Sequence, residues 1–95
     1  MNRHKLSADE LKTALETLEG WIMGEAGISS EFSFSSYPEC VAFAVRVALI
    51  AQADDHHPDA LTIGWGRVRV TYITHSAGGI TALDVDAARK ISQFK

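Results

Sequence analysis

The fold is decided by residues 61–75, which read LTIGWGRVRVTYITH. Two runs of strand-forming residues, 61–63 and 67–75, flank the segment Gly64-Trp65-Gly66. A short glycine-containing segment between two such runs is typical of a β-hairpin, because glycine adopts the positive φ angles of tight turns. We therefore expect two antiparallel strands joined by a turn at these residues.

The second run alternates in a way that defines the two faces of its strand. One face carries apolar and aromatic residues, namely Val68, Val70 and Tyr72. The other face carries mainly polar residues, namely Arg67, Arg69, Thr71, Ile73 and His75. Successive strand side chains point to opposite faces, so this pattern predicts one face covered by helices and one polar face. Folding the hairpin about Gly66 places His57 opposite His75.

Working outward, the N-terminal residues predict a helix followed by two strands. A Ser-x-x-Glu cap at Ser7 begins the helix, and leucines at helical spacing continue it to about residue 19, before Gly20. Residues 21–23 form a short apolar run, and residues 31–35 alternate with period two. The two runs therefore predict an antiparallel pair of strands.

A second helix, predicted from about residue 37 to residue 54, is apolar on nearly all sides. Its cap is Ser36-Tyr37-Pro38-Glu39, with proline in the first turn, where its missing N–H costs little. The helix contains six large apolar residues: Val41, Phe43, Val45, Val47, Leu49 and Ile50. Such a helix must be covered on most sides. It is either buried in the core or forms an interface between copies, which we favour because a chain of 95 residues has little else to cover it.

A third helix follows the break at Gly78-Gly79. Residues 81–84 cap it, and its inner stripe is Val85, Ala88 and Ile91. The element order is then α-β-β-α-β-β-α. This order predicts an α+β fold with a four-stranded antiparallel sheet and helices packed on one face, in a single domain over residues 1–95.

Charge and composition exclude several functional classes. The net charge is −3 with the signs interspersed, so direct nucleic-acid binding lacks its basic surface. Cys40 is the only cysteine and cannot form an intrachain disulfide, which fits a reducing compartment. Residues 1–5 lack the apolar region of a signal peptide, and the longest apolar stretch, 40–51, is too short to span a bilayer. We expect a cytoplasmic protein that does not bind membranes.

Three of the four histidines are predicted to lie near one cleft. His56 and His57 follow the second helix, His75 ends the hairpin, and Asp84 lies in the first turn of the third helix. Imidazole gives and takes protons near neutral pH, so several in one cleft suit acid–base chemistry. His4, near the N-terminus, is expected on the surface.

A metal site is the alternative chemical interpretation. Its ligands would be Asp55, His56, His57 and His75. Adjacent histidines rarely point at one ion, however, and no His-x-x-x-His spacing occurs, so we expect no metal. Nucleophilic catalysis by Cys40 is not expected either, because this residue lies in the apolar helix without a paired base.

The same residues resemble a known family. The run His56-His57-Pro58, followed at fixed spacing by Trp65, His75 and Asp84, is similar to the signature of the pterin-4a-carbinolamine dehydratases. Further similar segments are Leu6 to Glu10, Phe32-x-Phe34, Phe43-x-x-Arg46-Val47-Ala48 and Gly79-x-Thr81. The resemblance covers about residues 5–94, nearly the whole chain.

The resemblance implies an activity and a role for each site residue. The enzyme would eliminate water from a 4a-hydroxytetrahydropterin, with His56 and His75 as acid–base groups, and would need no metal or organic cofactor. His57 would hold the substrate, and Asp84 would orient His75 or an adjacent water. The implied substrate-binding set is Asp55, His56, His57, Pro58, Thr74, His75 and Ser76. Family members form homodimers or homotetramers, here through helix 37–54 and the sheet edges.

One position departs from the family pattern. The family carries an acidic residue four positions before the first histidine of the doublet, and this chain has Gln52 there. Asp54 and Asp55 lie close enough in sequence to supply the missing carboxylate. The departure bears on contacts to the pterin ring.

Two alternative functions remain open from the sequence. The chain could be an interaction protein, since animal relatives bind a transcription-factor dimerisation helix and some relatives act in Rubisco assembly. The latter lack the full set of His56, His57, His75 and Asp84, which this chain carries. It could also act on another pterin, such as one related to molybdopterin, because the same histidines would serve either ring system.

Overall fold

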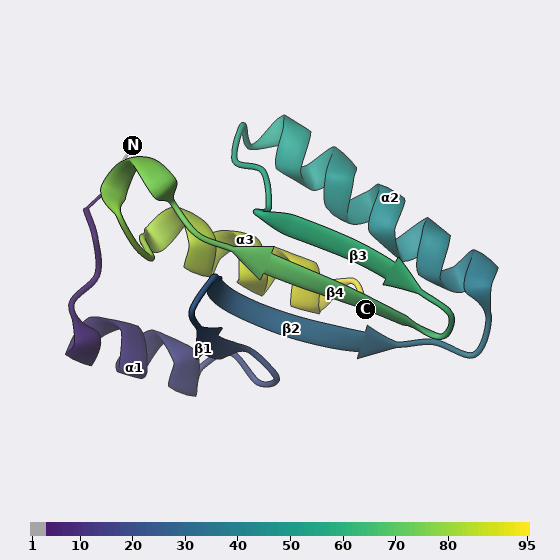
Figure 1. The fold of residues 1–95 in the computed structure, drawn as a ribbon, viewed down its shortest axis with the longest axis horizontal. Coiled ribbons are helices and arrows are strands. Elements are labelled where there is room, and N and C mark those ends of the chain that lie inside the picture. Colours follow the sequence, from purple (N-terminus) through teal and green to yellow (C-terminus); the bar gives the residue numbers. More distant parts are fainter. Residues whose placement is uncertain (1–3) are drawn as a thin grey trace.

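A computed structural model describes residues 4–95 of the protein. Met1, Asn2 and Arg3, which entered the argument about a signal peptide, lie outside the described residues. The elements are α1 (Ala8–Glu16), β1 (Ile22–Gly24), β2 (Gly27–Ser33), α2 (Tyr37–Ala53), β3 (Ala60–Gly64), β4 (Arg67–Tyr72), the 3-10 turn η1 (His75–Ala77) and α3 (Ala82–Gln93) (Figure 1). The predicted order α-β-β-α-β-β-α is confirmed, with η1 as an addition.

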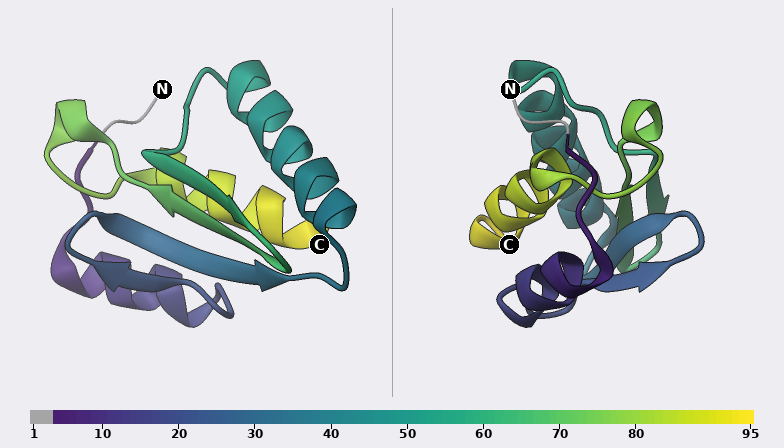
Figure 2. Two further views of the ribbon diagram at one scale, coloured as in Figure 1. Left: turned by 45° about the vertical axis from the view of Figure 1, so that its right-hand side comes forward. Right: turned by 90° about the vertical axis from the view of Figure 1, so that its left-hand side faces the viewer.

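The four strands form one antiparallel sheet in the order β1-β2-β4-β3. Viewed from the side, α1, α2 and α3 all lie on the same side of this sheet (Figure 2). The predicted α+β fold, with helices on one face, is therefore confirmed. The strand β4, whose faces the sequence defined, is a central strand, so its side chains reach both the helix layer and the open face.

The hairpin between β3 and β4 has a different register from the one predicted. Gly64 pairs with Arg67, which leaves Trp65 and Gly66 as a two-residue turn, and Gly66 has a φ of 80°. Pairing ends at Ala60 with Thr71, so His57 lies before β3 begins. The predicted pairing of His57 with His75 is wrong, because the turn is centred between residues 65 and 66.

The returning strand is also shorter than predicted. It ends at Tyr72, and Thr74 then makes an isolated bridge with Gly79. His75 therefore lies in η1, where it begins a tight turn, and not on the polar face of the strand. The turn η1 lies beyond the end of the sheet (Figure 1).

The strand β2 begins earlier than its alternating pattern indicated. It runs from Gly27 to Ser33, because Ile28 and Ser29 also pair with β1 and β4. A Cβ atom at Gly27 would lie 2.2 Å from the carbonyl oxygen of Tyr72. Only glycine allows the two backbones to approach this closely at the start of the strand pair.

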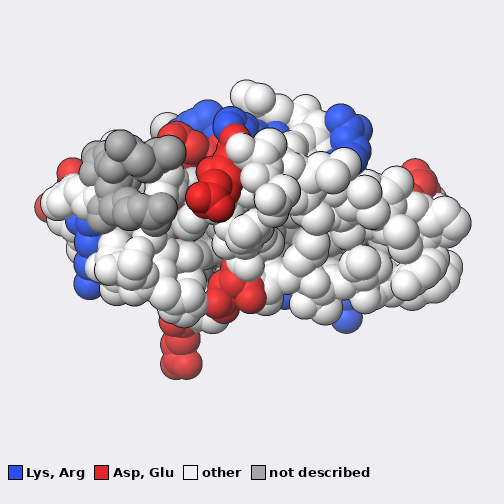
Figure 3. Space-filling model, turned by 90° about the horizontal axis from the view of Figure 1, so that it is seen from above, with Lys and Arg blue, Asp and Glu red and all other residues white. Residues whose placement is uncertain are grey.

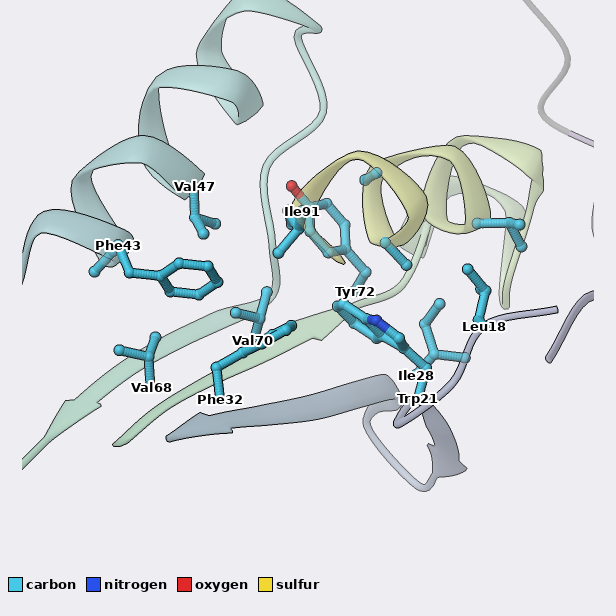
Figure 4. Close-up of a cluster of buried hydrophobic side chains, with 14 of the residues drawn as sticks. Leu18, Trp21, Ile28, Phe32, Phe43, Val47, Val68, Val70, Tyr72 and Ile91 are labelled. Atoms are coloured by element: carbon cyan, nitrogen blue, oxygen red, sulfur yellow. The ribbon is translucent and has the colours of Figure 1, made fainter. Parts of the chain in front are cut away.

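The core fills the space between the sheet and the helices (Figure 4). Inward residues of β2 and β4, such as Phe32, Val68 and Val70, pack there with the buried side of α2. Phe32 and Phe43 bring their ring centroids to 4.8 Å. Burial of such large apolar side chains is the main source of stability in a domain of this size.

Only one side of α2 is buried within the chain. Cys40, Phe43 and Val47 are buried, whereas Val45 and Leu49 are 51% and 65% exposed. The interpretation of α2 as a helix covered on all sides by its own chain is therefore wrong. None of the helices between residues 4 and 95 is long and apolar enough to cross a membrane.

Candidate active site

The segment that leaves α2 positions the histidine doublet. Asp55 has a φ of 51°, in the left-handed region, and its N–H donates to the Gln52 carbonyl at 3.3 Å. The His56 N–H donates to the Ala51 carbonyl at 3.1 Å. These two bonds form a Schellman motif, a common helix end in which the left-handed position is usually glycine. The motif reverses the chain after α2 and so fixes the backbone position of His56.

The His56 side chain ends on a buried carboxylate. Its Nε2 lies 2.6 Å from Asp84 Oδ1, and the two side chains are 11% and 0% exposed. Because a carboxylate only accepts hydrogen bonds, His56 donates through Nε2–H. In the neutral ring the other nitrogen, Nδ1, then carries no proton and can accept one. Asp84 was predicted to orient His75 or a water, and the structure instead pairs it with His56.

Asp84 is held by its place in α3. It is the third residue of the helix, and Oδ2 accepts hydrogen bonds from the Thr81 N–H at 2.9 Å and from Thr74 Oγ1 at 2.8 Å. Together with His56, the carboxylate has three donors. A buried carboxylate needs such partners, since burying an unpaired charge is costly. The capping box predicted from the sequence thus also provides the site with a fixed anion.

Tyr72 contacts His56 from the sheet side. The Tyr72 hydroxyl donates to the His56 backbone carbonyl at 3.2 Å, and the two ring centroids lie 5.3 Å apart at 32°. Burial, followed by the nearby charges of Asp54 and Asp84, raises the pKa of Tyr72 to about 12. The phenol therefore stays neutral at physiological pH and remains a hydrogen-bond donor. Nothing in the sequence singled out Tyr72 beyond its inward-facing position.

His75 pairs with a second carboxylate. His75 Nε2 lies 2.7 Å from Asp59 Oδ1, and its side chain is 76% exposed. Asp59 is fixed by its backbone, whose N–H donates to the Thr71 carbonyl at 2.8 Å. Asp59 was not among the predicted site residues, although its position immediately after Pro58, at the start of the hairpin, was a signal that could have been used.

His57 points back toward α2. Its Nε2 lies 3.1 Å from Gln52 Oε1, at the position where the family carries an acid. Asp54, one of the two proposed substitutes for that acid, forms an ion pair with Lys90 at 2.6 Å. Asp55, the other, is exposed at the end of α2. The amide of Gln52 thus orients His57 without adding charge.

A hollow of about 320 Å³ lies beside His56, between the end of α2 and the start of α3. It is lined by Ala53, Asp54, His56, Leu83, Asp86 and Ala87. The predicted substrate-binding residue Thr74 is only 3% exposed and donates its hydroxyl to Asp84. Pro58 is half-buried, and Ser76 is exposed on η1 next to His75. A larger hollow of about 720 Å³, between the ends of α1 and α3, contains none of the predicted site residues.

Three of the four histidines thus form separate pairs around the segment 56–59. His56 pairs with Asp84, His57 with Gln52 and His75 with Asp59. Within residues 4–95, no three His, Cys, Asp or Glu side chains are grouped so that they could hold a metal ion. Chemically, the arrangement supplies one buried and one exposed imidazole–carboxylate pair, which can donate and accept protons.

Comparisons with known proteins show which family the chain is similar to. Residues 4–94 match the family model described as pterin 4 alpha carbinolamine dehydratase. A relative from Mesorhizobium japonicum, provisionally named a pterin-4-alpha-carbinolamine dehydratase, is 43% identical and covers 99% of this chain and 97% of its own. A relative from Roseiflexus with the same provisional name is 39% identical, over 95% of this chain and 96% of its own.

Two solved structures are similar to this fold. The crystal structure of a transcriptional coactivator/pterin dehydratase from Brucella melitensis matches with a TM-score of 0.88 and 35% identity, covering 95% of this chain and 97% of that one. A pterin dehydratase-like protein identified as a RuBisCO assembly factor in the alpha-carboxysome matches with a TM-score of 0.66 and 21% identity, over 79% and 88% of the two chains. At that identity the second match shows the fold alone.

Proposed function

Because the chain belongs to the pterin 4 alpha carbinolamine dehydratase family, we propose that it removes water from a 4a-hydroxytetrahydropterin. In this reaction the bond between C4a and its hydroxyl oxygen breaks, and the oxygen takes a proton and leaves as water. N5 loses its proton, and a C4a–N5 double bond forms in the quinonoid dihydropterin product. The step needs one proton donor and one proton acceptor and no oxidant or reductant.

The observation that carries this proposal is the buried contact between His56 Nε2 and Asp84 Oδ1 at 2.6 Å. Asp84 holds the Nε2–H, so neutral His56 offers Nδ1 as a base. We assign His56 the removal of the N5 proton. His75, exposed and paired with Asp59, is the acid that protonates the departing hydroxyl. His56 then releases the N5 proton to solvent, and His75 takes up a proton from solvent, which restores both groups.

Other predicted residues take supporting roles in this proposal. His57, oriented by Gln52, binds the pterin ring. Asp55, Pro58 and Ser76 also bind it, because they lie on the segments that carry the two acid–base histidines. Thr74 acts through its hydrogen bond to Asp84. The enzyme that supplies this substrate would be an oxygenase that releases the hydroxylated pterin, since the hydroxyl at C4a must come from an oxygenation.

The test generates the 4a-hydroxytetrahydropterin in place with an aromatic amino-acid hydroxylase and follows its ultraviolet decay. Wild type should accelerate the decay, and His56→Ala and His75→Ala should each lose roughly 100-fold or more of that acceleration. His4→Ala is the matched control, because His4 lies before α1 and should leave the rate unchanged. If wild type does not exceed the uncatalysed decay, the dehydratase proposal fails, and a binding role or another pterin becomes the explanation.

We also propose that two copies of the chain associate through α2. Its outer side exposes Tyr37, Val45 and Leu49 at 49%, 51% and 65%, with small alanines between them. Figure 3 shows an expanse without charged residues over this helix. A second copy fits because an apolar stripe is complementary to itself, as a two-fold interface requires. The sheet edges β1 and β3 offer further contacts for a tetramer.

The expected cytoplasmic location stays a prediction, which cell fractionation would test. It accords with a substrate made by a hydroxylase inside the cell.

A further inference from the structure

Tyr72 places a polar hydroxyl at a fully buried position that faces the core. It is the last residue of β4, and its side chain points from the sheet into the helix layer (Figure 4). The other inward residues of that strand, Val68 and Val70, are purely apolar. Leucine or phenylalanine would fill the same space without a polar atom. A buried hydroxyl costs free energy unless it is hydrogen-bonded, so its presence calls for an explanation.

The hydroxyl is used on the segment that carries His56. Tyr72 Oη donates to the His56 carbonyl at 3.2 Å, while the Ala51 carbonyl accepts the His56 N–H at 3.1 Å. The backbone of His56 is thus held on both sides, by α2 and by β4. The Tyr72 ring also packs against the imidazole, at 5.3 Å between centroids. These contacts leave the imidazole little freedom other than to point at Asp84.

Tyr72 is also chemically suited to remain a donor. Its raised pKa keeps the phenol protonated, and the nearby carboxylates of Asp54 and Asp84 disfavour its ionisation. The His56 carbonyl accepts this hydrogen bond but is too weak a base to remove the phenol proton of Tyr72. The group therefore does not exchange protons with substrate at neutral pH.

We propose that Tyr72 is the positioning residue that holds His56 against Asp84, by a hydrogen bond to the His56 carbonyl and by ring packing on its imidazole. It acts through His56 and does not touch the reacting atoms. For its effect on rate the inference rests on the proposed dehydration, whereas the geometric claim about His56 does not.

The experiment compares Tyr72→Phe with wild type in two measurements. The first is the kcat and KM of the dehydration assay, with its pH profile. The second is the exchange rate of the His56 Nε2–H with water, followed by nitrogen-15 NMR of the imidazole. Thr13→Val is the matched control, because it removes an exposed hydroxyl from α1, outside both the candidate site and the proposed α2 interface. Denaturant unfolding verifies that each variant is folded.

We expect Tyr72→Phe to lower kcat by about 3- to 10-fold, with KM within about twofold, because one hydrogen bond is lost. The His56 Nε2–H should exchange several times faster, and Tyr72→Leu, which also removes the ring, should exceed both effects. An unchanged exchange rate in Tyr72→Phe overturns the proposal, whatever happens to kcat. If wild type proves inactive on the pterin, the proposed function fails, and the NMR measurement alone still decides the role of Tyr72.

Discussion

At the scale of single residues, the site is organised by one buried carboxylate. Asp84 is fully buried and accepts hydrogen bonds from a histidine ring, a hydroxyl and a backbone amide. An anion with three donors cannot rotate without breaking them, so it gives His56 one orientation and one tautomer. His75, by contrast, is oriented by the partly exposed Asp59. The two imidazoles therefore differ in freedom as well as in exposure.

Replacing Asp84 with asparagine should remove this organisation. The amide NH₂ would face at least one of the three donors, so the folded state should lose about 1–3 kcal/mol. His56 would also lose its acceptor, and the dehydration rate should fall by about 100-fold or more. Asp9→Asn is the control, since Asp9 is exposed in the first turn of α1 and does not line the hollow beside His56. Equal rates for the two variants would contradict a role for Asp84 in catalysis.

The raised pKa of Tyr72 predicts a loss of stability at alkaline pH. In the unfolded chain tyrosine ionises near pH 10, whereas in the folded chain it keeps its proton to about 12. Between these values the unfolded state releases a proton that the folded state retains, so the free energy of unfolding falls as pH rises. The resulting loss in the free energy of unfolding, complete at about pH 12, is on the order of 2–3 kcal/mol.

Denaturant unfolding of wild type and Tyr72→Phe from pH 8 to 12 measures this contribution. The variant lacks the phenol, so its stability should fall less steeply above pH 10. Parallel curves for the two proteins would show that Tyr72 titrates normally in the folded chain.

At the scale of elements, the C-terminal end of α2 sets the backbone conformation of the residues that lead into the candidate site. The Schellman motif places a non-glycine residue, Asp55, at a φ of 51°. An L-residue in this region is less favourable than glycine, although aspartate tolerates it better than most. A residue kept in an unfavourable backbone conformation next to two histidines suggests that its carboxylate serves the site. This agrees with the proposed contact of Asp55 to the substrate.

Asp55→Gly should therefore separate stability from activity. We expect the free energy of unfolding to rise by up to about 1 kcal/mol, because glycine adopts this φ without strain. The dehydration assay should show a higher KM. Asp54→Gly serves for comparison, since Asp54 has an ordinary helical φ and pairs with Lys90, so that variant should be less stable. A destabilised Asp55→Gly protein would contradict the argument.

At the scale of the whole molecule, a single chain leaves one helix side uncovered. The sheet and α3 bury the inner side of α2, whereas Val45 and Leu49 remain largely exposed. Exposed apolar stripes on helices mark interaction surfaces. A chain of this size also buries a limited share of its surface, so association adds stability that its own core lacks.

Leu49→Glu should convert an assembly formed through α2 into monomers. A charge within the apolar interface would be buried without a partner in each copy. Sedimentation or light scattering would report the mass, with Lys12→Glu on the exposed side of α1 as the matched control. Wild type that is monomeric at tens of micromolar would rule out the proposed interface.

The element order, the three helix caps and the buried face of β4 were predictable from the amino-acid sequence. These features depend on neighbours within a few residues and on the periods of helix and strand, which are readable along a chain. The positions of His56, His57, His75 and Asp84, together with the resemblance to a family, also predicted them as site residues, and these assignments stay predictions. The boundaries that it placed wrongly, in β2 and at the end of β4, lie where glycines and a long-range bridge set the strand ends.

Which groups meet depends on how the elements pack in three dimensions. Asp84 pairs with His56, 28 residues away, and not with His75, and Asp59 and Tyr72 join the candidate site although neither belongs to the predicted motif. The hairpin register depends on a two-residue turn, and a shift of one residue moves every side chain to the other face. Such contacts are set by how the sheet and helices pack in space, and sequence spacing alone does not specify that packing.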